Sequence, residues 1–151
     1  MRVFLDTNIL VDFYARREPF FQNAKLLWIA SYFKDVELWA STQSFVDIEY
    51  ILRRAVPVQT LREMMAKSLD LLRVSSPEPN DLTDGLSSGW PDLEDFLIAR
   101  CAQNEGADYL ITRDAKGFEN SIVPVVSPEQ FFRMLKEEYG VVSVSYTHLR
   151  A

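Results

Sequence analysis

The sequence predicts an α/β domain built around a mostly parallel sheet. Short apolar segments with the features of buried strands alternate along the chain with longer segments of helical spacing. Such alternation is typical of parallel sheets whose strands are joined by right-handed helical crossovers. The chain has 151 residues, which is the size of one domain, and neither a repeat nor a linker divides the sequence.

The first half of the chain begins with a short apolar run containing a β-branched residue, which indicates a buried strand. Asp6, Thr7 and Asn8 follow and can cap a helix, and Pro19 and Pro57 each open a further helical segment. In chain order we expect a strand at 2–5, helices over 9–14 and 19–32, a strand at 37–40, helices over 43–55 and 57–72, and a short strand at 73–75.

The second half begins with 76–91, which is rich in Pro, Ser, Gly and Asp and is expected to be mostly loop, with one helical turn around 82–86. Gly106 ends the helix that follows, and Pro124 marks the last strand as an edge strand. In chain order we expect a helix over 92–104, a strand at 109–112, a strand at 122–126 and a helix over 128–139.

The C-terminal residues differ from the rest of the chain. Val142–Ala151 has no helical period, and its end, Ser-Tyr-Thr-His-Leu-Arg-Ala, resembles a translated vector or adaptor scar. We therefore expect the domain to span residues 1–140 and residues 141–151 to form a non-native tail. The single histidine, His148, lies in this tail, so the expected domain has no imidazole for acid–base catalysis, a Ser-His-Asp triad or a metal site.

Composition limits the classes of protein and site. A single cysteine, Cys101, excludes an internal disulfide and a thiolate zinc cluster. The N-terminus lacks the features of a signal peptide, and no stretch approaches the roughly 18 apolar residues that span a bilayer, so we expect a cytoplasmic protein with no membrane partner. The formal net charge is −6, which disfavours nucleic acid as a partner unless carboxylates bind divalent cations.

Basic residues are still available for contact with nucleic acid. Six arginines can form a local phosphate-facing rim: Arg16, Arg17, Arg53, Arg54, Arg100 and Arg113.

Carboxylates follow two of the expected strands. Asp6 comes directly after the first strand, and Asp114 lies two residues past the strand at 109–112. If these strands are neighbours, about 4.8 Å apart, the two side chains converge where sites form in parallel sheets. Asp92 and Asp95 share one face at the start of the helix at 92–104, and Glu94 is expected to point away from it.

A cluster of carboxylates implies a bound cation, because like charges raise each other's pKa unless something neutralises them. Ligands that are all oxygen favour Mg²⁺ or Mn²⁺ over zinc or copper. One or two such ions suit hydrolysis of a phosphodiester through an activated water. The residues alone therefore predict a metal-dependent phosphodiesterase.

Three motifs resemble the PIN-domain family, which includes the VapC-type toxin nucleases. They are Leu-Asp-Thr-Asn-Ile-Leu at 5–10, Asp-Leu-Glu-Asp at 92–95 and Ala-Asp-Tyr-Leu-Ile-Thr-Arg-Asp at 107–114. The resemblance covers residues 2–135. It implies a three-layer α/β/α fold, a Mg²⁺- or Mn²⁺-dependent endoribonuclease whose products carry 5′-phosphate and 3′-hydroxyl ends, a small antitoxin partner and a homodimer.

The resemblance also implies roles for individual residues. Asp6, Asp95 and Asp114 match the acidic positions that hold the metal, Asn8 matches a residue that orients the first carboxylate, and Thr112 matches a hydroxyl that supports the last acid, with Asp92 nearby. The acid of the central helix is either Asp47 or Glu49, which lie about 200° apart around the helix and so cannot both face the site. The family's spacing before a helix leucine favours Asp47.

Other function classes fit the sequence less well. A phosphatase of the haloacid-dehalogenase type needs a second Asp where Asn8 stands, and a phosphorelay receiver needs a paired acid after the first strand and a Lys after the last. A non-catalytic PIN-like scaffold that binds RNA or protein is the main alternative. The set of four acids argues against it, because unneeded carboxylates are costly to keep close together.

Overall fold

The computed structural model describes residues 1–140, and the expected non-native tail at 141–151 lies outside the described residues. The strands are β1 (Arg2–Leu5), β2 (Glu37–Ser41), β3 (Leu72–Ser75), β4 (Tyr109–Ile111) and β5 (Val125–Val126). The helices are α1 (Thr7–Tyr14), α2 (Phe21–Tyr32), α3 (Thr42–Leu52), α4 (Val58–Ser68), α5 (Pro79–Leu86), α6 (Leu93–Asn104) and α7 (Pro128–Tyr139), with a short 3-10 helix, η1 (Ala115–Phe118).

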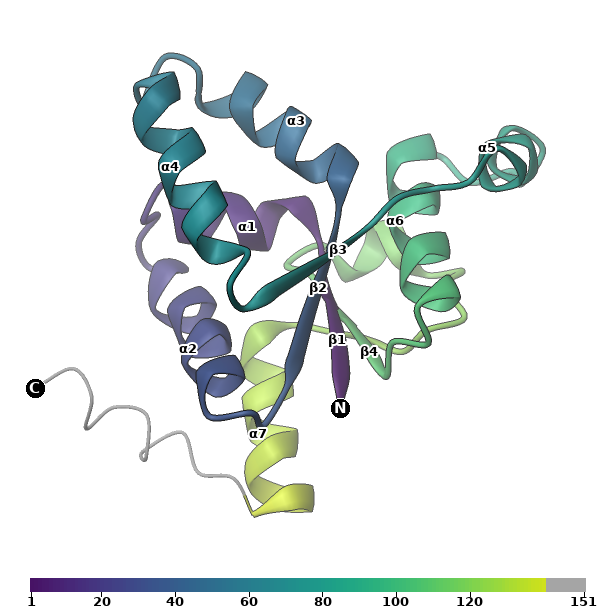
Figure 1. Cartoon of the computed structure of the whole chain (residues 1–151). Coiled ribbons are helices and arrows are strands. Elements are labelled where there is room, and N and C mark those ends of the chain that lie inside the picture. The colour runs from purple at the N-terminus through teal and green to yellow at the C-terminus, as the bar shows by residue number, and fades with distance from the viewer. Residues whose placement is uncertain (141–151) are drawn as a thin grey trace, which may run out of the picture.

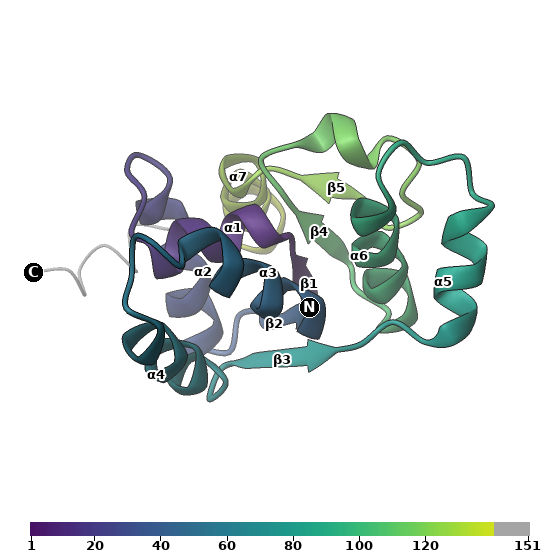
Figure 2. The same ribbon diagram turned by 90° about the horizontal axis from the view of Figure 1, so that it is seen from above.

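The five strands form one parallel sheet in the order β3-β2-β1-β4-β5. Figure 2 shows α5 and α6 on one face and α1, α2, α4 and α7 on the other, while α3 packs against α1 and α4. The three-layer α/β/α fold and the parallel sheet are therefore confirmed. β1 lies at the centre and pairs with β4, which makes the strands before Asp6 and Asp114 neighbours.

The period-two alternation of β1 divides the core between the two faces of the sheet. Val3 and Leu5 pack in the larger core with α1, α2, α3, α4 and α7. Phe4, which is fully buried, packs on the other face with Ile98 and Cys101 of α6. Burying a side chain of this size contributes about 1.5–3 kcal/mol, so β1 links both layers and holds Asp6 on a rigid support.

The prediction of one helical turn around 82–86 within a loop at 76–91 underestimated the helix. Residues 79–86 form helix α5, which begins with a capping box between Glu78 and Asp81. Burial acts to raise the pKa of Asp81, but hydrogen bonds from the Glu78 amide, Asn104 and Arg100 outweigh it and leave the pKa lowered. The interactions with α6 that support this helix come from residues about 20 positions away in sequence, which local composition does not show.

The remaining expected elements are present, with different ends. The helix expected at 57–72 ends at Ser68, because Leu72 already belongs to β3. The helix expected at 43–55 ends at Leu52, and the strand expected at 122–126 is reduced to β5 at the sheet edge. Within residues 1–140, no helix is long and apolar enough to cross a membrane.

Candidate active site

A cavity of about 320 Å³ lies beyond the carboxyl ends of the strands. In Figure 1, α3 and α6 stand on either side of this edge of the sheet. The residues that line the cavity come from α1, α3, α6 and the segments next to them: Asp6, Thr7, Asn8, Val11, Arg17, Ile51, Asp92, Glu94, Asp95 and Asp114. Asp6, Asp92, Asp95 and Asp114, separated by up to 108 positions in sequence, therefore face one space.

Asp6 is buried at the end of β1 and both of its carboxylate oxygens accept hydrogen bonds. Oδ1 accepts from the Thr7 amide at 2.7 Å, and Oδ2 accepts from the Thr112 hydroxyl at 2.7 Å. Asn8 donates to Thr112 Oγ1 at 3.3 Å, so it acts on Asp6 through Thr112. Thr112 Oγ1 also accepts from the Asp114 amide at 3.0 Å. Thr112 therefore connects Asp6 to Asp114.

Arg113 lies between Thr112 and Asp114, and its guanidinium is bound to Asp12. Nε and Nη2 contact the two oxygens of Asp12 at 2.6 and 3.1 Å, and Asp12 is 1% exposed. This bidentate pair fixes the segment after β4 to α1. The sequence carries no signal for this role of Asp12, because its partner Arg113 is 101 positions away.

Gly117 of η1 brings the carboxylates of Asp95 and Asp114 to one point. A Cβ at this position would lie 2.7 Å from Asp95 Oδ2 and 3.0 Å from Asp114 Oδ2. Only glycine leaves room for both carboxylates beside the backbone. Asp92 caps α6, because its side chain accepts from the Asp95 amide at 3.1 Å, and this bond sets where the helix begins.

Glu94 does not point away from the site, and that expectation was wrong. It lines the cavity, is half-buried, and receives a long hydrogen bond of 3.4 Å from Thr7. A sequence signal was present, because Glu94 precedes the buried Ile98 and Cys101 by four and seven residues, which places all three on the face of α6 that packs on the sheet.

Asp47 and Glu49 lie in different surroundings. Glu49 forms hydrogen bonds of 2.6 and 3.0 Å with Arg62, and this bond lowers its pKa. Asp47 does not line the cavity itself, but it lies close enough to Glu94 to help raise the pKa of Glu94. Asp47 Oδ2 is buried and meets no hydrogen-bond partner within residues 1–140, so this oxygen is available to a cation.

Burial and mutual repulsion raise the pKa values of several of these acids. The pKa of Asp95 rises to about 7, first through burial and then through the charges of Asp92, Asp6 and Asp114. The pKa of Glu94 also rises to about 7, through burial and the Asp47 charge. Burial raises the pKa of Asp6 as well, against its hydrogen bonds from Thr112 and Thr7. Near neutral pH the negative charges of the cavity are thus not balanced by positive charges.

The donor set fits a hard divalent cation, although the carboxylates are not arranged around one. Across residues 1–140, no three acidic, histidine or cysteine side chains are placed so that they could hold a metal ion as they stand. The fit rests on other observations. All the ligand atoms are oxygens, Asp47 Oδ2 lacks a donor, and the absent Cβ of Gly117 leaves space between Asp95 and Asp114.

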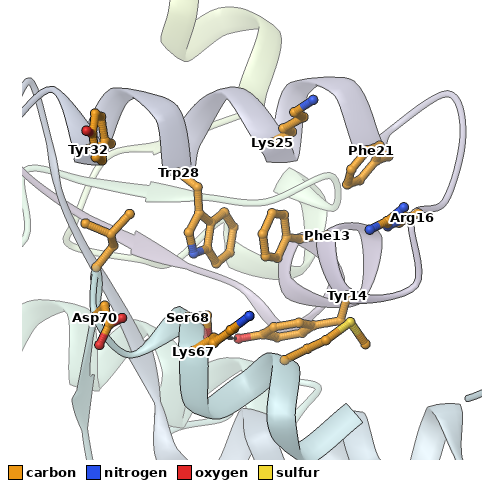
Figure 3. Close-up of a pocket in the computed structure, with 12 residues that line it drawn as sticks. Phe13, Tyr14, Arg16, Phe21, Lys25, Trp28, Tyr32, Lys67, Ser68 and Asp70 are labelled. Atoms are coloured by element: carbon orange, nitrogen blue, oxygen red, sulfur yellow. Dashed lines mark hydrogen bonds between the residues drawn. The ribbon is translucent and has the colours of Figure 1, made fainter. Parts of the chain in front are cut away.

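A second, larger hollow of about 700 Å³ lies between α1, α2 and α4 (Figure 3). Its floor is aromatic, with Phe13 and Trp28 stacked at 3.8 Å. Trp28 Nε1 is buried and has no hydrogen-bond partner among the described residues. Arg16, Lys25 and Lys67 line the hollow together with one acid, Asp70. We call it the aromatic groove, and it offers apolar contacts, a buried donor and positive charge.

Comparison with known proteins identifies the family. The profile of the PIN domain matches residues 2–116. This chain belongs to the PIN-domain family. The match includes Asp6, Asp95 and Asp114, and it extends from β1 into η1. The resemblance carried by the three sequence motifs is therefore confirmed. A search of curated protein sequences found no match to this chain.

Solved structures resemble this PIN domain over most of its length. One is VapBC2 from Rickettsia felis bound to a DNA fragment from its promoter, with 19% identity, a TM-score of 0.60, and coverage of 84% of this chain and 98% of that one. Another is a toxin–antitoxin complex from Klebsiella pneumoniae, with 21% identity, a TM-score of 0.58, and coverage of 83% and 97%. FitAcB from Neisseria gonorrhoeae has 14% identity, a TM-score of 0.60, and coverage of 84% and 98%. At these identities the likeness supports the fold.

Proposed function

We propose that this PIN domain is a metal-dependent endoribonuclease that hydrolyses phosphodiester bonds of RNA. The observation that carries the proposal is the set of acids on one cavity at the strand ends. Asp6, Asp95 and Asp114 share this cavity with Glu94, and the pKa values of Asp95 and Glu94 rise to about 7. Such a cavity favours a divalent cation, because the ion would remove the repulsion that raises these pKa values.

Asp6, Asp95 and Asp114 would hold one or two Mg²⁺ or Mn²⁺ ions, with Glu94 of α6 and Asp47 of α3 completing the site. When bound, the ion makes a water molecule more acidic and offsets the charge at the leaving oxygen. Thr112 orients Asp6 and restrains the Asp114 backbone, with Asn8 as its further partner. Asp92 positions Asp95 by capping α6. Glu49 is bound to Arg62 and has no part in this proposal.

The proposal is tested by incubating the protein with labelled single-stranded RNA in Mn²⁺ and in EDTA. We expect cleavage in Mn²⁺ and none in EDTA, with Mn²⁺ binding seen by calorimetry. Absence of both cleavage and Mn²⁺ binding would favour the non-catalytic scaffold that binds RNA or protein. Mn²⁺ binding without cleavage would show that the site binds metal but that this RNA is not its substrate.

The same assay separates Asp47 from Glu49. Asp47→Asn is expected to reduce cleavage at least tenfold and weaken Mn²⁺ binding, because it removes one charge beside Glu94. Glu49→Gln, the matched control, loses a charge on the same helix but only breaks the exposed pair with Arg62, which water and salt screen. Equal cleavage by the two variants would place the central-helix acid outside the site.

We further propose that the nuclease is the toxin of a toxin–antitoxin pair, and that a segment of the antitoxin binds in the aromatic groove. The solved toxin–antitoxin complexes with the same fold support the class of partner, and the positive rim of the groove suits a segment with apolar and acidic side chains.

Expression of this chain in a bacterial host is expected to arrest growth. Co-expression of the protein encoded beside it should restore growth of cells that express the wild-type chain. It should not restore growth of cells that express the Lys25→Glu variant. Equal rescue of this variant would place the partner elsewhere.

A further inference from the structure

Two adjacent arginines in the turn after α1 extend into different hollows. Arg16 lines the aromatic groove, whereas Arg17 lines the acidic cavity. The separation follows from the backbone, because Arg16 has a φ of 51°. This left-handed conformation is uncommon for a residue with a Cβ. It reverses the chain at this point, so that consecutive side chains face opposite sides of the turn.

The backbone of Arg17 is held on both sides, although its side chain is exposed. Its amide donates to the Asp12 carbonyl at 3.0 Å, and its carbonyl accepts from the Phe21 amide at 2.6 Å. Its charge acts on Asp12, but within residues 1–140 its guanidinium has no hydrogen bond or ion pair. Arg17 is therefore a positioned cation whose five N–H donors remain available.

Two other arginines of the rim predicted from the sequence are already bound. Arg113 forms its bidentate pair with Asp12 and stacks over the Phe20 ring at 3.9 Å. Arg100 is bound to Asp81 and Asp84. Among the described residues that line the acidic cavity, Arg17 is the one with a positive charge, and it faces five carboxylates.

We propose that Arg17 binds a backbone phosphate of the RNA next to the bond that is cut. This inference rests on the proposed nuclease function. A polyanion entering a cavity with five carboxylates is repelled, and metal ions at the acids would offset only the repulsion at the scissile phosphate. A neighbouring phosphate needs its own cation. A guanidinium suits this contact, because its planar fork matches two phosphate oxygens, and the contact is independent of base identity.

The test measures binding of fluorescein-labelled oligouridine and of a labelled mixed-sequence single strand by anisotropy, in Ca²⁺ and over a series of KCl concentrations. Arg17→Ala is expected to weaken binding of both strands about tenfold. Its plot of log affinity against log salt should be shallower by about 0.7, the contribution of one phosphate contact on a single strand. Arg17→Lys should keep the salt dependence and recover part of the affinity.

Arg16→Ala is the matched control, because it removes the same charge from the neighbouring residue on the other side of the turn. It should leave affinity and salt dependence unchanged. Wild-type values for Arg17→Ala, or an equal loss for Arg16→Ala, would overturn the assignment while leaving the nuclease proposal intact. A wild-type protein that binds neither Mn²⁺ nor RNA would overturn both. Thermal midpoints equal to that of the wild type show that the variants fold.

Discussion

Replacing Asp6 with Asn is expected to lower the rate of metal-dependent RNA cleavage by about three orders of magnitude. Asn has nearly the same shape as Asp and can still accept a hydrogen bond from the Thr7 amide, but it carries no charge to hold a cation. Because burial raises the pKa of Asp6, its ionised form destabilises the folded state above that pKa. The thermal midpoint of Asp6→Asn without metal should therefore equal or exceed that of the wild type.

Asp108→Asn provides the control for this experiment. Asp108 is an exposed acid just before β4 that accepts a hydrogen bond from the Arg2 amide at 2.8 Å, so it lies at the opposite end of the sheet from the cavity. Its substitution should leave both cleavage and Mn²⁺ affinity unchanged. Cleavage by Asp6→Asn at the wild-type rate would contradict the role proposed for Asp6.

Gly117→Ala is expected to lower cleavage about a hundredfold, with a loss of Mn²⁺ affinity and little loss of stability. The added methyl group would lie 2.7 Å from Asp95 Oδ2 and 3.0 Å from Asp114 Oδ2. These oxygens are the ends of side chains at the cavity, so they can move aside at small cost to the fold. Displacing the reacting groups by about 1 Å is enough to reduce a rate by this amount.

Gly85→Ala is the matched control, because its methyl group would be equally crowded. It would lie 2.7 Å from Phe96 Cδ1 and 2.8 Å from Leu93 Cδ1, between α5 and α6, where Phe96 is buried. We expect a loss of about 1–3 kcal/mol in the free energy of unfolding, measured with urea, and unchanged Mn²⁺ affinity. If both variants lose stability alike and neither loses metal affinity, the role given to Gly117 is wrong.

Local pattern was sufficient for the fold class and for four of the five acids that line the cavity. The alternation of strand and helix segments predicted the parallel sheet, because each element shows its buried face through its own period. Asp6 and Asp114 were found because both follow strands, and parallel strands place their carboxyl ends at one edge. Asp95 was found because it lies on one helix face with Asp92. These inferences needed only spacing along the chain.

Contacts between distant segments decided the rest. Only one turn of helix α5 was predicted, because the bonds of Arg100 and Asn104 to Asp81 near its start are not visible in the local sequence. The different surroundings of Asp47 and Glu49 depend on how α3 packs against α1 and α4, which its own sequence leaves open.

Arg17 and Arg113 are both among the six arginines from which the sequence predicts a phosphate-facing rim. Only the fold pairs Arg113 with Asp12 and leaves Arg17 in the cavity. Charges and hydrogen-bond donors act over a few ångströms in space, so their partners are determined by tertiary packing, whereas hydrophobic periodicity is determined along the chain itself.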